Sequence, residues 1–417
     1  MKAVQRLIHK GKYSLSLFLL LACNYLSAQV YQLPTQGIRQ MAMAGSGTAL
    51  TWNSDVVFYN PAGISDLNLW EVSVSGGGIY NDIRYTKDTI SATNDVQVLP
   101  FYNLYVAGPI RASKDKVSVG VGFYSPFGNK IRWHNDWVGR HLVQEASFQT
   151  IFAQPTVCYK FSSKFSIGAG YIVAYGKLRM KQATVVPDAS GNNDGHGIIS
   201  SDAWGRGFNA GIHFKLTKTL QLGLTYRSKV NMYANSGTTQ YNVNQAYADS
   251  FPSSKIRVTI PLPQVASFGV GFRPTKKLVL QADVNFNGWW KNDTLQIDIA
   301  QNTGLQDDIT VARNYKNTFT YRLGINFAFS SKFAVMAGGA LDESAVPDSY
   351  LSPEMPEADR IITSLGFSSR PFEKITISAA AQYIFCDPRT GSYAPGNFSG
   401  TNDLKRISAG LGFALDF

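Results

Sequence analysis

The sequence is short of charged residues and of cysteine. Only 16% of its 417 residues are charged, against about 25% in a typical soluble domain, which argues against an ordinary cytosolic enzyme. There are only 3 cysteines. Cys23 lies in the apolar leader described below, and Cys158 and Cys386 are far apart in the chain, so a framework of disulfides is not expected. We interpret the last two as buried, small apolar residues.

Long apolar runs are also absent. Nowhere does the chain have the roughly 20 apolar residues that a membrane-spanning helix needs. The short run "SLSLFLLLA" (Ser14–Ala22) follows a basic stretch and precedes the small residue Ala28. This arrangement is typical of a secretory signal peptide, so we predict a cleaved leader over residues 1–28. The stretch "LLAC" (Leu20–Cys23) resembles a lipoprotein cleavage box, which leaves lipidation of Cys23 as the alternative.

Groups that carry catalysis or hold metals are sparse. The 5 histidines stand in no recognisable Ser/His arrangement, and no nucleotide-binding loop of the Walker type occurs. We therefore predict no enzymatic activity, no metal, no cofactor, no use of ATP and no nucleic-acid partner. The net charge is +11, and four positive charges belong to the leader, which leaves +7. This excess favours anionic ligands or lipopolysaccharide phosphates, or it reflects Lys and Arg in turns and rims.

What the chain does have is alternation. From Leu69 onward apolar residues recur at every second position, as in "VSVGVGF" (Val117–Phe123), "LQLGLTYR" (Leu220–Arg227) and "FTYRLGINFAF" (Phe319–Phe329). Strict alternation indicates half-buried strands. The runs are long enough to cross a bilayer, and their second face carries Gly, Ser and Asn, as the lumen of a barrel would. A closed barrel is favoured because lipid does not tolerate unpaired strand edges.

The connections between these runs alternate in length. Short turns carrying Lys, such as Ser162–Lys164 and Ser330–Lys332, are separated by longer polar stretches such as Pro187–Gly197 and Asn235–Ser250. This is the pattern of bacterial outer-membrane barrels, and so is the aromatic carboxy-terminus, Phe417. The predicted fold is all-β: an antiparallel outer-membrane β-barrel of about 14 strands over residues 70–417, located in the bacterial outer membrane.

Residues 29–69 lack this alternation. "QGIRQMAMAGSGTAL" (Gln36–Leu50) is rich in small residues and is expected to form short helices. "DVVFYNPAGIS" (Asp55–Ser65) combines apolar residues with a strand-breaking proline. We predict that residues 29–69 form an N-terminal hatch that plugs the lumen. The alternative, a tail in the periplasm, would expose many apolar side chains to water.

The stretch "GIRQMAMAGSGTALTWNSDVVFYNPAGIS" resembles the hatch of the long-chain fatty acid outer-membrane transporter family (FadL/TodX/OMPP1 type), which carries Asn-Pro-Ala. "FYSPFGNKIRWHNDWVGR" (Phe123–Arg140) is similar to the third strand of that family and the loop after it, and "ALDESAVPDSYLSPEMPEADR" (Ala340–Arg360) also matches in order. The resemblance implies a fourteen-stranded barrel with a gap in its wall, where the third strand kinks inward beside the hatch.

The resemblance also implies gate residues. The hatch set is Asn60, Pro61, Ala62 and Gly63, and the kink with its lateral opening is Ser125, Pro126, Phe127 and Gly128. Asn60 is expected to contact Ser125. A kink makes independent sense, because Pro126 removes a ladder hydrogen bond and Gly128 relieves the backbone at the bend. An ordinary strand end at "SPFG" is the alternative.

The implied function is diffusive uptake of long-chain fatty acids or similar hydrophobic molecules. The candidates for binding a carboxylate head group in the lumen are Lys177, Arg179, Lys181, Arg313 and Lys316. Solvated rim charges are the alternative for these residues. One family Arg position is occupied by Gln182, so a neutral cargo such as an aromatic hydrocarbon or a haem-like molecule stays open, as does a role as a barrel partner of a secretion system.

Overall fold

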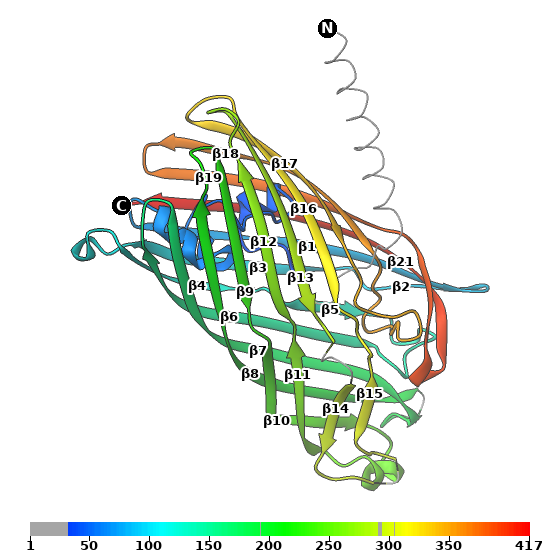
Figure 1. Ribbon diagram of the computed structural model, residues 1–417. Helices are drawn as coiled ribbons and strands as arrows, with labels where there is room; N and C mark the ends of the chain where they lie inside the picture. Colours follow the sequence, from blue (N-terminus) through cyan, green and yellow to red (C-terminus); the bar gives the residue numbers. More distant parts are fainter. Residues whose placement is uncertain (1–31, 192, 291–293, 304) are drawn as a thin grey trace.

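The computed structural model describes residues 32–417 apart from 192, 291–293 and 304. The predicted signal peptide and Cys23 therefore lie outside the described residues. One antiparallel sheet closes on itself as a fourteen-stranded barrel (Figure 1). Strand β1 (Glu71–Lys87) pairs with β3 (Gln97–Pro109) on one side and with β21 (Phe398–Asp416) on the other, which closes the ring. The short β2 (Ile90–Thr93) folds back on the end of β1.

Several of the barrel strands consist of two consecutive chain segments, each with its own strand label. In chain order the other strands are β4 (Val117–Tyr124), β5 (Gly128–Arg132), β6 (Glu145–Lys160), β7 (Phe165–Pro187), β8 (Asp194–Lys215), β9 (Leu220–Arg227), β10 (Val230–Asn242), β11 (Ser254–Leu262), β12 (Gln264–Phe272), β13 (Leu278–Gly288), β14 (Thr294–Ile299), β15 (Ile309–Ala312), β16 (Thr318–Ala328), β17 (Phe333–Asp342), β18 (Arg360–Phe372), β19 (Ile375–Cys386) and β20 (Arg389–Tyr393). Segments β4 and β5, for example, both pair with β6. Single 3-10 turns occur at η2 (Arg111–Ser113), η3 (Gln245–Ser250) and η4 (Ala394–Gly396).

The alternation along each strand separates an outer from an inner face. In β16, Thr320 and Arg322 are buried, whereas Tyr321 and Leu323, which alternate with them, are 46% and 65% exposed. Leu365 and Leu411 on other strands are 66% and 57% exposed. An apolar face turned outward around a polar interior requires lipid around the molecule, so the predicted outer-membrane barrel is confirmed. Among the described residues, no helix is both long and apolar enough to span a bilayer.

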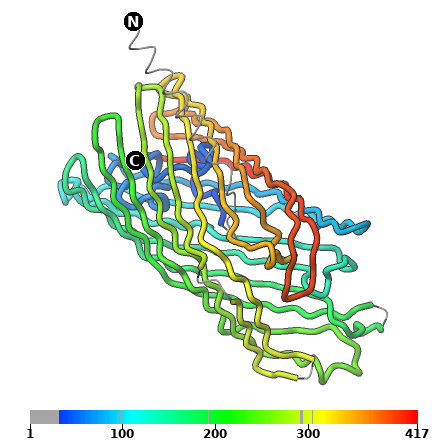
Figure 2. The backbone as a smooth tube through the Cα atoms, turned by 45° about the vertical axis from the view of Figure 1, so that its right-hand side comes forward, coloured from blue at the N-terminus to red at the C-terminus, as the bar shows by residue number. Residues whose placement is uncertain are grey.

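The two ends of the barrel differ. Short connections, such as 161–164 between β6 and β7, lie at one end (Figure 2), and β1 begins and β21 ends there too. Short turns mark the periplasmic end of outer-membrane barrels. The opposite, extracellular end carries the long connection 343–359 between β17 and β18.

The N-terminal segment, residues 32–68, lies inside the barrel (dark blue in Figure 1). It contains α2 (Ile38–Ala42), α3 (Val56–Tyr59) and the 3-10 helix η1 (Pro61–Asp66). Helix α2 packs on β18 and β19, whereas η1 packs on β6, β7 and β8 across the ring. The segment therefore touches distant parts of the wall, and most of its residues are buried.

Two wall glycines allow η1 to lie directly on the sheet. A Cβ atom at Gly168 would lie 2.4 Å from the carbonyl carbon of Pro61, and one at Gly211 would lie 2.2 Å from the Oδ1 atom of Asn60. No side chain fits at such distances, so only glycine permits this close approach of helix and wall.

Candidate functional site

The third strand of the barrel is interrupted. Segments β4 and β5 both pair with β6, but β3 pairs with β4 only as far as Asn103 opposite Tyr124. In the described part of the chain no ladder joins β3 to β5. The three residues between the two segments, Ser125–Phe127, leave the ladder of the wall. This break coincides with the kink predicted at Pro126, where the backbone has no N–H to donate.

The start of the N-terminal segment takes the place of β3 at the break. The backbone N–H of Leu33 donates to the carbonyl oxygen of Pro126 at 3.0 Å, and Gln36 Nε2 donates to the carbonyl oxygen of Ser125 at 3.1 Å. Gln32 forms a bridge with Phe127. Backbone groups that the kink frees are thus satisfied from inside the lumen, as a buried polar backbone requires.

The predicted contact between Asn60 and Ser125 is wrong. The amide of Asn60 donates to the carbonyl oxygens of Thr48 (2.8 Å) and Ile212 (3.1 Å), and its Oδ1 accepts from Ala62 N–H at 3.1 Å. Ser125 Oγ donates to the carbonyl oxygen of Thr150 at 2.7 Å. Asn60 is therefore used to cap η1 and to join it to β8, and Ser125 is bound to β6.

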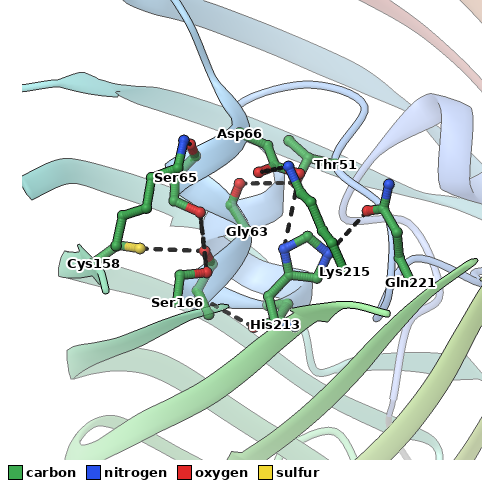
Figure 3. Close-up of polar contacts among 12 residues, drawn as sticks. Thr51, Gly63, Ser65, Asp66, Cys158, Ser166, His213, Lys215 and Gln221 are labelled. Atoms are coloured by element: carbon green, nitrogen blue, oxygen red, sulfur yellow. Dashed lines mark hydrogen bonds and ion pairs between the residues drawn. The ribbon is translucent and has the colours of Figure 1, made fainter. Parts of the chain in front are cut away.

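The Asn-Pro-Ala-Gly stretch, with Pro61, Ala62 and Gly63 buried in η1, forms an anchor (Figure 3). The carbonyl oxygen of Ala62 accepts hydrogen bonds from Ser166 Oγ at 2.9 Å and Cys158 Sγ at 3.2 Å. Cys158 is buried, as expected, but its thiol also has this polar role, while Cys386 is only half-buried.

The end of η1 is held by charge. Asp66 forms an ion pair with Lys215 and lies 3.8 Å from the Nδ1 atom of His213. His213 Nε2 lies 3.0 Å from Gln221 Oε1. These side chains come from β8 and β9 and converge on η1 in Figure 3. Nothing in the sequence marks this set, because alternation does not show which polar residues meet the N-terminal segment.

Buried polar side chains of the wall hold the rest of the segment. Asp283 Oδ2 accepts from the N–H groups of Gly47 (2.8 Å) and Thr48 (3.0 Å) and from Thr48 Oγ1 (2.9 Å). Arg227 donates to the carbonyl oxygen of Phe58 at 2.9 Å, and its guanidinium lies 4.3 Å from the centre of the Phe58 ring. The N-terminal segment is therefore held by side chains from several strands at once.

Asp55, just before α3, is a titratable group in the N-terminal segment. Its Oδ1 accepts from Gln40 Nε2 at 2.8 Å. Burial raises the pKa of the Asp55 carboxyl to about 7, and the hydrogen bond from Gln40 only partly offsets that effect. The charge of Glu71 raises this pKa further, and that of Arg39 lowers it.

We expect the seating of the N-terminal segment to weaken as the pH rises through about 7. The buried Asp55 carboxyl binds its proton more tightly than a hydrated carboxyl with a pKa of 3.8. Its contribution to the stability of the seated segment is therefore complete below pH 3.8. This contribution is lost as the pH rises through about 7, and it is on the order of a few kcal/mol. Limited proteolysis of residues 32–68 at several pH values measures it. Asp55→Asn should show no such dependence, and identical pH profiles for both proteins would contradict this role.

The three cationic candidates on β7 do not face the lumen. Lys177, Arg179 and Lys181 share one face of the strand, as predicted, but the buried residues of β7 alternate with them. Arg179 pairs with Glu145 at 3.2 Å on the outer surface. The prediction that these residues bind a head group in the lumen is therefore wrong. Lys316 is exposed.

Arg313, in contrast, is buried in an apolar pocket. The pocket lies between β5, β6, β7, β11 and β14, and its apolar lining is Phe148, Leu178, Met180, Ile260 and Leu295. Arg313 Nη2 lies 3.3 Å from Glu354 Oε1, and the two side chains are only 7% and 14% exposed. The pocket thus combines a long apolar wall with one buried ion pair. Among the described residues no cluster of three or more His, Cys, Asp or Glu side chains could hold a metal.

The family model for the outer membrane protein transport protein family (OMPP1/FadL/TodX) matches residues 19–413. The chain belongs to this family. It is an outer-membrane protein for the transport of hydrophobic molecules. The long-chain fatty acid transport protein of Escherichia coli O6:H1 is 22% identical over 82% of this chain and 83% of its own length. Outer membrane protein P1 of Haemophilus influenzae is 22% identical over 88% of both chains.

Solved structures of family members share the fold. A Pseudomonas aeruginosa FadL homologue superposes with a TM-score of 0.82 at 18% identity, over 93% of this chain and all of that one (100%). The Pseudomonas putida toluene transporter TodX superposes with a TM-score of 0.74 at 15% identity, over 91% and 98% of the two chains. At these identities the likeness establishes the shared barrel. The names of the family and these relatives describe transport rather than enzymes.

Proposed function

We propose that this protein takes up long-chain fatty acids, or similar hydrophobic molecules, by diffusion through a lateral opening in its wall. Residues 32–68 act as the hatch, and the unpaired stretch between β3 and β5 is the opening. The observation that carries the proposal is this break in the wall ladder, with an apolar pocket lined by residues of β5 itself and of neighbouring β6 and β7.

The pocket suits hydrophobic molecules, which enter a water-filled pore poorly. Each methylene group moved from water into an apolar site gains about 0.8 kcal/mol, so residues such as Phe148, Leu178 and Leu295 favour hydrocarbon over water. Entry of an aliphatic tail or an aromatic ring requires the pocket to widen. Release then requires a rearrangement that weakens these contacts. The short hydrogen-bonded contact between Leu33 and Pro126 is the part of the hatch that would move.

Gly128 tests the opening directly. A Cβ atom there would lie 3.3 Å from Leu33 Cδ1 and 3.7 Å from Leu99 Cδ2, so the position faces both the hatch and β3. Gly128→Ala should be tolerated after small shifts. Gly128→Trp should fill the opening and lower uptake of radiolabelled oleate by roughly tenfold or more, because it adds a large side chain to a tightly packed gap.

The measurement is initial uptake in cells that express equal amounts of folded, heat-modifiable barrel. Uptake by Gly128→Trp equal to that of Gly128→Ala would reject the lateral route. Loss of folded barrel in both variants would be separated from a block by the electrophoretic shift on heating.

The buried Arg313 favours an acidic cargo. A guanidinium binds a carboxylate through two parallel hydrogen bonds, and Arg313 is the predicted cationic candidate that lies in the pocket. One observation favours a second candidate, a neutral hydrophobic cargo: Glu354 already pairs with Arg313 at 3.3 Å, which leaves the pocket close to neutral. The names of two relatives also include both kinds of cargo: one is named for fatty acids, which are acidic, and the other for toluene, which is neutral.

Arg313→Gln decides between these cargoes. For a long-chain carboxylate we expect about a tenfold or greater loss of affinity, since a charge-assisted hydrogen bond contributes about 1.5–3 kcal/mol, and little change for toluene. Arg179→Gln is the matched control, because that guanidinium lies on the outer face. Tryptophan fluorescence or calorimetric titration in detergent gives both affinities. An equal loss for the acid and for toluene would reject a carboxylate site.

Lipid contact follows from the apolar outer face. Residues such as Leu323 and Leu365 on β16 and β18 are placed to contact acyl chains of the outer membrane. Binding of lipopolysaccharide phosphates stays a prediction.

A further inference from the structure

The periplasmic end of the lumen holds a basic cavity that is separate from the apolar pocket. It opens among the short turns that follow β8, β12, β16 and β18, and residues of the hatch form its inner wall. Its cationic residues include Arg39, Arg273, Arg370, Lys218, Lys276 and Lys332. No Asp or Glu occurs among the described residues that line it. Such one-sided charge in a concave surface attracts anions.

Two of the arginines have nitrogen atoms that nothing satisfies. The Nε atoms of Arg39 and Arg273 are buried and have no hydrogen-bond partner. Within the described residues, no carboxylate lies within 4.0 Å of either guanidinium. Exposed lysines in the turns are solvated by water. A buried N–H group without a hydrogen-bond acceptor, in contrast, lowers the stability of the folded protein unless a ligand supplies the acceptor.

The third arginine is partly compensated. Arg370 lies 3.4 Å from Asp416 and donates to Thr376 Oγ1 at 3.3 Å. Burial lowers the pKa of Arg39 to about 10; the charges of Asp55 and Glu71 oppose this shift, and the weaker repulsion from Arg370 and Arg273 adds to it. An anion between them would remove this repulsion.

The cavity also has an apolar part. The Arg39 guanidinium lies 4.4 Å from the centre of the Trp52 ring, and Trp52, Val279 and Ala334 contribute to the lining. A stacked guanidinium keeps its N–H edge available for hydrogen bonds, since stacking uses only its face. The cavity therefore offers donors for an oxyanion beside a surface for a small hydrocarbon group.

We propose that this cavity binds the carboxylate or phosphate group of a small organic anion, held between Arg39 and Arg273. Arg39 belongs to α2 of the hatch, and Arg273 follows β12 in the barrel wall. The bound anion would therefore link the hatch to the barrel at the periplasmic end. This second site is distinct from the uptake function proposed above.

The test is calorimetric titration of the full-length protein in a nonionic detergent at low ionic strength. Three probes separate the sources of the anion: inorganic phosphate, sodium hexanoate and short-chain dihexanoyl phosphatidylglycerol. We expect saturable binding of at least one probe, and a loss of affinity of about tenfold in Arg39→Gln and in Arg273→Gln. The preferred probe identifies a free phosphate, a carboxylate or a lipid head group.

Lys164→Gln is the matched control, because Lys164 lies in another periplasmic turn, outside the cavity, and it should bind like the wild type. Heat-modifiability confirms that each variant is folded. Equal affinity in the two arginine variants and in the wild type, or no saturable binding of any probe by the wild type, would overturn the proposal. Failure of the Gly128 experiment would leave this result unchanged, so the two proposals are tested separately.

Discussion

Gly168→Val should dislodge the N-terminal segment and make the barrel leak. A Cβ atom at this position would lie 2.4 Å from Pro61 C, 2.5 Å from Pro61 O and 2.6 Å from Ala62 N. All three are backbone atoms of η1, so no rotamer change relieves the clash. If overpacking costs about 3 kcal/mol here, the population with a released segment rises roughly a hundredfold.

The measurement is entry of a hydrophilic antibiotic into cells, together with protease sensitivity of residues 32–68. Ala169→Val is the matched control, since it adds bulk to the next residue of β7, which is exposed on the outer face. Unchanged permeability in Gly168→Val, at equal amounts of folded barrel, would contradict the view that the segment closes the pore.

Asp283→Ala should loosen the hatch from its other side. The carboxylate accepts three hydrogen bonds from Gly47 and Thr48, and Arg322 stands directly opposite it in the pairing of β13 with β16. Removal of the acid leaves the two buried N–H groups and the Thr48 hydroxyl without their acceptor, and it removes the negative charge opposite Arg322. Each buried donor without an acceptor costs about 1–3 kcal/mol.

Hydrogen exchange of the peptide that contains Gly47 and Thr48 measures this loss. We expect exchange to accelerate by a factor of about 100 or more if opening of this loop governs it. Asp283→Asn, which keeps one acceptor, should be intermediate, and Asp298→Ala on the exposed face of β14 should exchange like the wild type. Equal exchange in all four proteins would show that the carboxylate does not hold the loop.

Local patterns were enough to predict the barrel, whereas the place of the kink was predicted by resemblance to the family. Alternation in stretches such as Phe319–Phe329 is a property of each strand alone, and it persists because one face meets lipid. Pro126 supports a kink because it lacks a backbone donor, but it does not locate one by itself, since Pro155 stands inside the continuous ladder between β4 and β6.

The orientation of the β7 cations was not predictable in the same way. Strand β7 has 23 residues, whereas about 9–11 cross the bilayer, so one end of it stands beyond the lipid. There the outer face is wet and tolerates Lys177 and Arg179, and polarity no longer marks the lumen. The inner face of the same stretch supplies Leu178 and Met180 to the apolar pocket.

The contacts of the hatch were out of reach for a different reason. Arg227 meets a residue 169 positions away, and Asp283 meets residues more than 230 positions away. Their partners depend on the closure of the ring. Asn60 was assigned to the kink by resemblance, but its side chain donates to Thr48 and to Ile212 of β8 and accepts from Ala62 of η1.

A slit between two strands exposes edges that neighbouring molecules can extend into a larger sheet. At the break described above, each bordering chain segment contains a proline: Pro100 in β3 and Pro126 just after β4. Neither proline has a backbone N–H to offer to an added strand, which discourages a second molecule from pairing there. If the break is the lateral opening proposed above, the wall can stay open at this point without recruiting a neighbouring barrel.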